Sequence, residues 1–270
     1  MTNESTEPVA GTGVDWSVPH SARIWNYWLG GKDNYAVDRE AGDAWIAKDP
    51  GVVYEAKQSR LFLIRAVRYL AGEAGIRQFL DIGTGLPTMQ NTHEVAQSVA
   101  PESKIVYVDS DSLVLAHARA LLTNTTPEGV TAYVDADYHN PELIISDARN
   151  VLNFNEPMAV MLMGVLGHAR DYETARSIVA RVMDAVPSGS YLTHWDSAST
   201  DATAVAAMEE YNDTGAVPYI QRSPEQIRRF YDGLELLEPG FGPISQWRPD
   251  NPEADSIPPT YSHGGVARKK

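Results

Sequence analysis

Three aspartates lie at the ends of three successive apolar runs. Asp81 belongs to QFLDI, Asp109 ends KIVYVD, and Asp135 comes from GVTAYVDAD. Each run reads as a buried strand, and ligands of an open α/β sheet bind where its strands end. A single acid there is most often a solvated or helix-capping carboxylate. Three of them at neighbouring strand ends indicate a site for hydroxyl, amino or cationic groups.

A glycine turn follows the first of these runs. Gly83 and Gly85 in DIGTGLPT let the backbone approach a ligand closely. The phosphate-binding motif GxxxxGK[ST] is absent from the sequence, and GxGxxG fails because Thr88 occupies the third glycine position. The Asp81 carboxylate would also repel a pyrophosphate. An NAD-dependent oxidoreductase is therefore disfavoured.

S-adenosylmethionine matches these residues better, because it carries a sulfonium, an amino group and a ribose but no phosphate. Asp81 beside the glycine turn suits the cationic methionine end. Asp109 suits the ribose, since one carboxylate can accept hydrogen bonds from two hydroxyls. Asp135 suits the adenine amino group. The pattern predicts S-adenosylmethionine as the cofactor.

The elements that position these residues begin near residue 76, where short apolar runs alternate with helical periodicity. Strands are expected at 78–82, 104–109, 129–137, 157–166 and 188–196, and helices at 88–100, 112–122, 141–148, 172–186 and 200–212. Five such β-α units predict a doubly wound sheet covered by helices on both faces. A helix is expected at 223–233, and 235–247 is expected to add strands at the sheet edge.

The region before residue 76 reads as helices without strands. It holds four of the six tryptophans, and helices are expected after an N-cap at Ser21, at 36–48 and at 53–71. We expect a leader at 1–15, a helical lid or extension at 16–75 and a cofactor-binding domain at 76–270. An N-terminal helix commonly covers an active site, although plain packing on the domain is the more ordinary interpretation. The lid hypothesis places four side chains over the cofactor and acceptor: Arg23, Tyr27, Lys32 and Tyr35.

Composition limits the partners. The 22 Lys and Arg residues against 36 Asp and Glu give a net charge of −14, which disfavours nucleic acid and anionic membranes. No cysteine is present, which excludes thiolate metal sites, and no metal is expected. No run reaches the roughly 18 apolar residues of a membrane span, and the first residues lack a secretory pattern. We expect a cytoplasmic protein with a small-molecule acceptor; nothing specifies an oligomeric state.

Several longer stretches resemble one known family. They are SARIWNYWLGGKDNYAVDREAG (21–42), IRQFLDIGTGLPTMQNTHEVAQ (76–97), VYVDSDSLVLAHARALL (106–122), YVDADYHNPELII (133–145), MAVMLMGVLGHARD (158–171) and GGVARK (264–269). The chain resembles the actinobacterial-type S-adenosyl methyltransferases, formerly a domain of unknown function. This resemblance implies the class I Rossmann-like methyltransferase fold, a doubly wound α/β sheet, with bound S-adenosylmethionine. It names no acceptor.

The resemblance also implies roles for individual residues. It assigns Asp81, Gly83 and Gly85 to the methionine end, Asp109 to the ribose, and Asp135 to the adenine, with Asp137 as the alternative to Asp135. We expect the neighbouring Ser110, Ala136 and Met163 to share the cofactor site. The chain departs from the family pattern at two places: Pro87 replaces the third small residue of the glycine motif, and Ser59-Arg60 replaces an Asn-Arg pair.

Methyl transfer needs a general base only if the acceptor begins as a protonated group such as a hydroxyl. His168 in GVLGHA and His194 in LTHWD are the candidate catalytic residues, since both follow or end expected strands. For His168, a capping or packing role is an equal alternative. His194 could equally stay buried and hydrogen-bonded. Because no base is obvious, a non-catalytic module that binds S-adenosylmethionine or S-adenosylhomocysteine is the alternative function.

Overall fold

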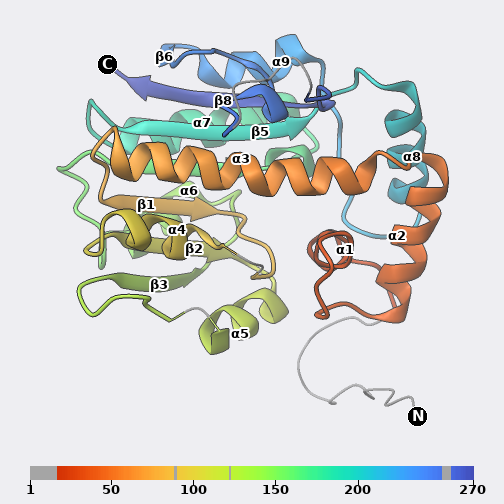
Figure 1. Ribbon diagram of the computed structural model, residues 1–270, viewed down its shortest axis with the longest axis horizontal. Helices are drawn as coiled ribbons and strands as arrows, with labels where there is room; N and C mark the ends of the chain where they lie inside the picture. Colours follow the sequence, from red (N-terminus) through yellow and green to blue (C-terminus); the bar gives the residue numbers. More distant parts are fainter. Residues whose placement is uncertain (1–16, 88–89, 122, 251–256) are drawn as a thin grey trace.

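The computed structural model describes residues 17–87, 90–121, 123–250 and 257–270 (Figure 1). The expected leader at 1–15 and Thr88 of the glycine motif lie outside the described residues. None of the helices in the described part of the chain combines the length and apolar character that a bilayer crossing requires.

Eight strands of the described chain form one sheet in the order β3-β2-β1-β4-β5-β8-β6, with β7 paired to β8. They are β1 (Gln78–Ile82), β2 (Lys104–Asp109), β3 (Val130–Asp135), β4 (Ala159–Met163), β5 (Tyr191–Ser197), β6 (Leu234–Leu236), β7 (Gly242–Pro243) and β8 (Ser262–Lys269). Strands β1 to β5 are parallel, and β8 runs antiparallel between β5 and β6. The strand order reverses at β1, so a ligand site is expected beyond the ends of β1, β2 and β4.

Helices cover both faces of the sheet and its carboxyl end. They are α1 (Ser21–Trp28), α2 (Ala36–Lys48), α3 (Val52–Gly72), α4 (Thr92–Val99), α5 (Ser112–Leu121), α6 (Pro141–Ala148), α7 (Tyr172–Ala185), α8 (Ala202–Asn212) and α9 (Pro224–Arg228), with short 3-10 turns η1 (Leu166–His168), η2 (Arg229–Tyr231) and η3 (Ile244–Gln246). The predicted doubly wound α/β sheet with an N-terminal helical extension is confirmed.

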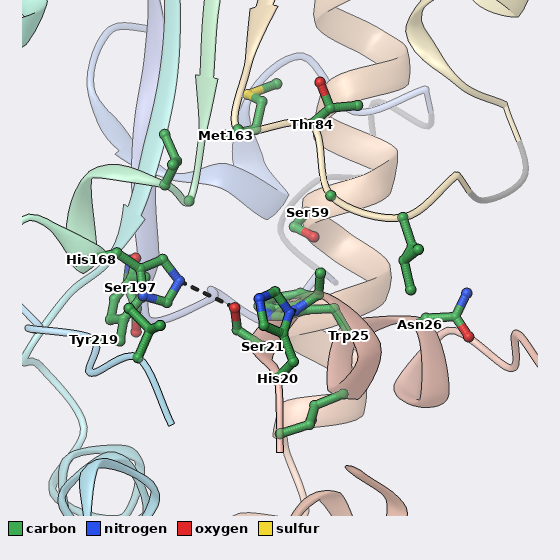
Figure 2. A pocket seen from close by; sticks show the side chains of 18 of the residues that line it. His20, Ser21, Trp25, Asn26, Ser59, Thr84, Met163, His168, Ser197 and Tyr219 are labelled. Carbon is green, nitrogen blue, oxygen red and sulfur yellow. Dashed lines mark hydrogen bonds between the residues drawn. The ribbon is translucent and has the colours of Figure 1, made fainter. Parts of the chain in front are cut away.

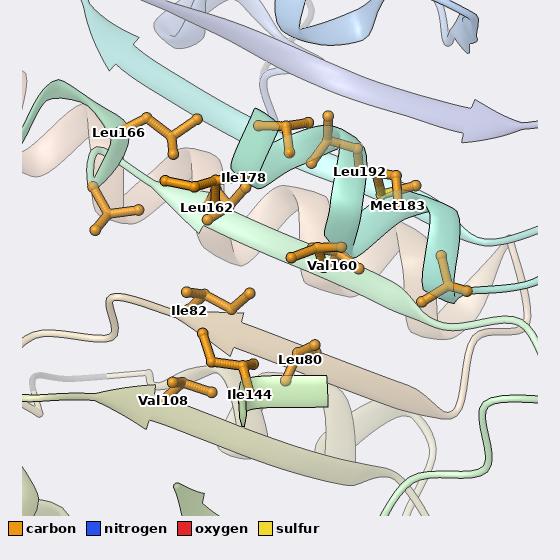
Figure 3. Packing of buried hydrophobic residues seen from close by; sticks show 14 of the residues in the cluster. Leu80, Ile82, Val108, Ile144, Val160, Leu162, Leu166, Ile178, Met183 and Leu192 are labelled. Atoms are coloured by element: carbon orange, nitrogen blue, oxygen red, sulfur yellow. The ribbon is translucent and has the colours of Figure 1, made fainter. Parts of the chain in front are cut away.

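Alternation along β1 divides the core into two layers, because successive side chains of a strand point to opposite faces. Leu80 and Ile82 pack with the cluster that contains Ile144 of α6 and Ile178 of α7 (Figure 3). Phe79 belongs instead to the cluster on the opposite face, together with α3 and α4. Asp81 therefore lies on the α3–α4 face of the sheet.

A third apolar cluster joins α1, α2 and α8 beyond the carboxyl ends of the strands (Figure 1). Its members include Trp28, Trp45, Met208 and Tyr211. Most of α3, by contrast, packs in the cluster of the sheet. The division of the chain at residue 75 stays a prediction, and the packing groups α3 with the sheet rather than with α1 and α2.

Two details differ from the sequence-based expectations. His20, not Ser21, precedes α1 as its N-cap, and the His20 side chain accepts a hydrogen bond from the amide of Ala22. The stretch SHGGVARK forms β8, which was not expected to be a strand. Its glycines and basic residues hide the alternation, yet it pairs along the whole of β5, from Tyr191–Arg268 to Ser197–Ser262. The expected edge strands in 235–247 correspond to β6 and β7, which pair with β8 rather than with each other.

Candidate active site

One pocket, with a cavity volume of about 470 Å³, lies beyond the carboxyl ends of β1, β2 and β4. This size falls within the roughly 300–1,000 Å³ of small-molecule sites. The β1 turn and the β2 end contribute to its lining, together with α1, α3 and the segment after α8. Met163 at the end of β4, His168 and Ser197 of β5 also face it (Figure 2). The pocket therefore joins the predicted cofactor residues to the N-terminal helices.

The glycine turn after β1 forms a close-fitting edge of this pocket. Gly83 and Gly85 have φ angles of 72° and 67°, a region that side chains other than glycine rarely adopt. A Cβ atom at Gly83 would overlap the side chain of Val165. Both glycines line the cavity, so their lack of side chains leaves room for a ligand beside the backbone.

Asp109 holds the turn and still faces the cavity. Its Oδ2 accepts a hydrogen bond from the Gly85 amide at 3.0 Å, and its Oδ1 accepts one from the Asp111 amide at 2.9 Å. Burial raises the pKa of Asp109. Each carboxylate oxygen can accept a further hydrogen bond, so the pair fits the two hydroxyls of a ribose. The neighbouring Ser110 also lines the pocket, as does Met163 at the end of β4.

A contact between His20 and Asp111 connects the N-terminal segment to the turn after β2 at the same place. The Nε2 of His20 lies 2.9 Å from an oxygen of Asp111, and both side chains line the pocket. Burial acts to raise the pKa of Asp111, but hydrogen bonds from His20 and the α5 amides lower it to about 2. Asp111 thus caps α5 and bonds the start of α1 across the cavity.

Asp81 is placed differently from the expectation. Its side chain is 4% exposed and accepts a 2.7 Å hydrogen bond from Thr92, the first residue of α4, and it does not line the pocket. Burial raises the pKa of Asp81 to about 6, and the positive charge of Arg60 opposes that rise. Arg60 itself lines the pocket, together with Ser59. Asp81 therefore faces Arg60 and α4 rather than the cavity, because alternation along β1 turns it toward that face.

The adenine side also differs in detail. Ala136 lines the pocket, but Asp135 and Asp137 are exposed and do not. Asp137 bonds instead to the amide and ring of His139 in its own turn, at 2.9 and 2.8 Å. Tyr138, which the sequence did not single out, lines the pocket beside Ala136. Both aspartates are next to Ala136 in the chain, and Asp137 also precedes Tyr138.

His168 faces the pocket with a defined tautomer. Its Nδ1 lies 3.0 Å from the carbonyl oxygen of Pro218, which can only accept, so Nδ1 carries the proton. The unprotonated Nε2 then accepts from the hydroxyl of Ser21 at 3.3 Å (Figure 2). Burial lowers the pKa of His168, which keeps the ring neutral. The ring of Tyr219 packs edge-on against it at 5.0 Å.

His194 lies behind the pocket wall. It is 0% exposed, packs against Phe230 and Tyr231, and has Nε2 3.3 Å from Asp196. His194 does not line the cavity. It is therefore a buried side chain and is not placed to contact an acceptor. Asp196 in turn accepts a 2.9 Å hydrogen bond from Tyr219.

The four expected lid residues do not line the pocket. Arg23 pairs with the buried Asp38, Tyr27 bonds to Asp43 at 2.7 Å, Lys32 is exposed, and Tyr35 precedes α2 beneath the Arg23 guanidinium. For Arg23 and Tyr27, helix geometry is consistent with this, since positions four apart share a face; Lys32 and Tyr35 lie after α1. Ser21, Trp25 and Trp28 of α1 line the cavity, and the intervening Arg23 and Tyr27 point elsewhere.

Aromatic rings form the remaining wall. Trp25 lies 5.7 Å from Trp195 and 5.6 Å from Trp28, and Tyr211 packs against Trp45 at 5.6 Å, measured between ring centroids. All five rings line the pocket. This part of the cavity suits a flat, apolar group.

The strand order with an antiparallel β8, the glycine turn and the acid after β2 define a class I methyltransferase-type α/β protein. A family model described as S-adenosyl methyltransferase matches residues 8–270. The chain belongs to the S-adenosyl methyltransferase family and is an S-adenosylmethionine-dependent methyltransferase. This assignment favours the enzyme over the non-catalytic binding module.

Solved structures agree with this assignment. A DUF574 family protein from Streptomyces avermitilis MA-4680 is 42% identical with a TM-score of 0.89, covering 94% of this chain and 98% of that one. A candidate methyltransferase from Thermobifida fusca YX is 40% identical with a TM-score of 0.89, covering 98% and 100%. The mitomycin 7-O-methyltransferase MmcR, 15% identical with a TM-score of 0.51, shares the fold over 92% of this chain and 68% of its own. No curated protein sequence matches the chain.

Proposed function

We propose that this enzyme transfers the methyl group of S-adenosylmethionine to a small aromatic acceptor held against the tryptophan-rich wall. One observation carries the proposal: a single cavity contains Asp109 and the glycine turn, the aromatic rings, and the unprotonated Nε2 of His168. Cofactor and acceptor can therefore bind side by side in one cavity, which favours methyl transfer by positioning.

The cofactor residues divide by chemistry. Asp109 would accept hydrogen bonds from the ribose, while Ala136 and Tyr138 would contact the adenine, with Asp137 at that edge. Arg60 suits the methionine carboxylate, because guanidinium and carboxylate match in charge and geometry. Among residues 17–87, 90–121, 123–250 and 257–270, no hydrogen bond engages the Arg60 guanidinium. Bound there, S-adenosylmethionine supplies the activated methyl group.

His168 is the proposed general base. Its Nε2 would take the proton of an acceptor hydroxyl while Nδ1 keeps its own proton on Pro218. Ser21, which bonds Nε2 here, would turn toward the acceptor or be displaced by it. An acceptor atom that carries no acidic proton would need no such step.

The acceptor is proposed to be a small molecule rather than nucleic acid. The net charge of −14 repels phosphate backbones, and the lining is rich in aromatic rings. A cytoplasmic site of action is part of the same proposal.

Incubation with methyl-labelled S-adenosylmethionine and a panel of small phenols tests this function. We expect label in the organic extract and S-adenosylhomocysteine in equal amount. His168→Gln should abolish most of the label, whereas His263→Gln, outside the pocket lining, should not. Label that enters only RNA or protein would contradict the small-molecule proposal.

A further inference from the structure

One buried acid in the pocket has no part in the function proposed so far. Glu55 of α3 is 3% exposed and lines the cavity one helical turn before Ser59. The other acids that line the described pocket are Asp109, the last residue of β2, and Asp111 in the turn that follows. Glu55 therefore places a carboxyl group on a different wall.

The hydrogen bonds of Glu55 come from uncharged donors. Oε1 accepts from the Tyr261 amide at 3.0 Å and Oε2 from the Ser262 amide at 3.1 Å. The Ser262 side chain also hydrogen-bonds to this carboxyl group and acts to lower its pKa. A carboxylate has about four acceptor sites, so capacity for a ligand remains. These two amides hold the carboxyl group in place at the start of β8.

No positive charge in the described part of the chain compensates Glu55. No Lys, Arg or His side chain forms an ion pair with it, and the ionisable groups that act on it from the neighbouring elements, Asp49, Tyr54 and Tyr261, are acidic or neutral. Burial raises the pKa of Glu55 to about 7. An unpaired buried carboxylate is costly, and a cationic ligand group would relieve that cost.

The surroundings of Glu55 are apolar and aromatic. Val52 and Ala56 flank it on α3 and pack in the same cluster as Trp28 and Trp45, and both tryptophans line the pocket. An ammonium group placed here would meet a carboxylate together with indole rings, and indole faces also attract cations. The net charge of −14 further favours the approach of a cation.

We propose that Glu55 is the recognition carboxylate of the acceptor site and that the acceptor is an aromatic molecule bearing a protonated amine. This inference rests on the proposed function and deepens it. The ammonium group donates to the free acceptor sites of Glu55, and the ring lies against the tryptophan-rich wall. The methylated atom is then held by the other end of the molecule.

Calorimetric titration of the S-adenosylhomocysteine-saturated enzyme with tyramine and with 4-ethylphenol tests this inference, because the two probes share a phenol and differ in the amine. We expect tyramine to bind at least about tenfold more tightly. Glu55→Gln should remove that preference, whereas Glu40→Gln on the exposed side of α2 should retain it. Tyramine should also release protons on binding below pH 7, shown by titration in two buffers of different ionisation heat.

Several results would overturn the inference. They are equal affinities for the two probes, no measurable binding of either at millimolar concentration, or a preference for tyramine that survives in Glu55→Gln. If Glu55→Gln lowers only the affinity for S-adenosylhomocysteine, the Glu55 carboxylate contacts the cofactor rather than the acceptor. If Glu55→Gln does not fold, the comparison of the two probes on the unaltered enzyme still decides. Because binding needs no turnover, failure of methyl transfer to phenols is distinguishable from failure of this inference.

Discussion

The Nδ1 of His168 lies 3.0 Å from the carbonyl oxygen of Pro218, which joins the turn after β4 to the segment after α8. Further hydrogen bonds hold the same turn. Arg222 donates to the carbonyl oxygens of Leu166 and Ala169. The Gly167 amide donates to Asp196. These contacts fix the imidazole before any acceptor binds. A base that is already oriented needs little rearrangement in the transition state.

Replacement of His168 by glutamine should lower kcat for a hydroxyl acceptor by about 10²- to 10⁴-fold, the usual contribution of a general base. The cofactor residues are untouched, so the Kd for S-adenosylhomocysteine should stay the same. Steady-state kinetics and calorimetry on one preparation measure both. An unchanged kcat would show that the acceptor loses no proton to His168.

For an acceptor without an amine, such as 4-ethylphenol, the pH dependence of kcat/KM follows from the same residue. Burial lowers the pKa of His168, and this exceeds the opposite effects of the Pro218 carbonyl and the Asp196 charge. The base works when unprotonated, so activity should be level at neutral pH and decline only below about pH 6.5, the ordinary histidine pKa. A fall in kcat/KM that begins above about pH 6.5 as the pH is lowered would contradict the assignment of His168 as the general base.

Arg60 offers a test of the methionine end. Arg60→Ala should weaken S-adenosylhomocysteine by roughly tenfold to a hundredfold, since hydrogen bonds to charged groups contribute about 1.5–3 kcal/mol. Arg68→Ala is the matched control, because Arg68 lies on the same helix and pairs with the exposed Asp250. If the two variants bind S-adenosylhomocysteine with similar affinity, Arg60 does not contact the cofactor.

Glu55 should also make stability depend on pH. Its pKa in the folded chain is raised to about 7 from 4.5, so the folded state holds a proton that the unfolded state has lost. The free energy of unfolding should therefore fall as pH rises from about 4.5 to 7, by about 3 kcal/mol at most. Thermal melts of Glu55→Gln should show a flatter profile, with a residual slope from Asp81, whose pKa is raised to about 6. A slope identical to that of the unaltered protein would contradict this role.

The sequence predicted the parts of the site that depend on local pattern. Strand β1 and the end of β2 have the expected bounds, and Gly83, Gly85 and Asp109 line the pocket where the strand ends meet. An apolar run and its terminal acid specify both the strand and its end, so little tertiary information is needed.

Residues whose orientation depends on packing were not predictable in the same way. Arg60 and Glu55 lie on a helix that has apolar neighbours in several directions, and only the docking of α3 shows which face meets the cavity. Arginine is a residue type that often binds ligands, yet the Arg23 side chain forms an ion pair with Asp38 of α2. β8 is recognisable only through its partner β5, because its own sequence has no clear alternation.

The most direct test of the central claim is calorimetric titration of the protein with S-adenosylhomocysteine and NAD, with Asp109→Ala beside the exposed control Asp184→Ala. The account predicts a Kd on the order of micromolar for S-adenosylhomocysteine, at least about tenfold weaker in Asp109→Ala and unchanged in Asp184→Ala. It predicts no comparable binding of NAD. Preferential binding of NAD, or equal affinity in the two variants, would contradict the assignment of this pocket.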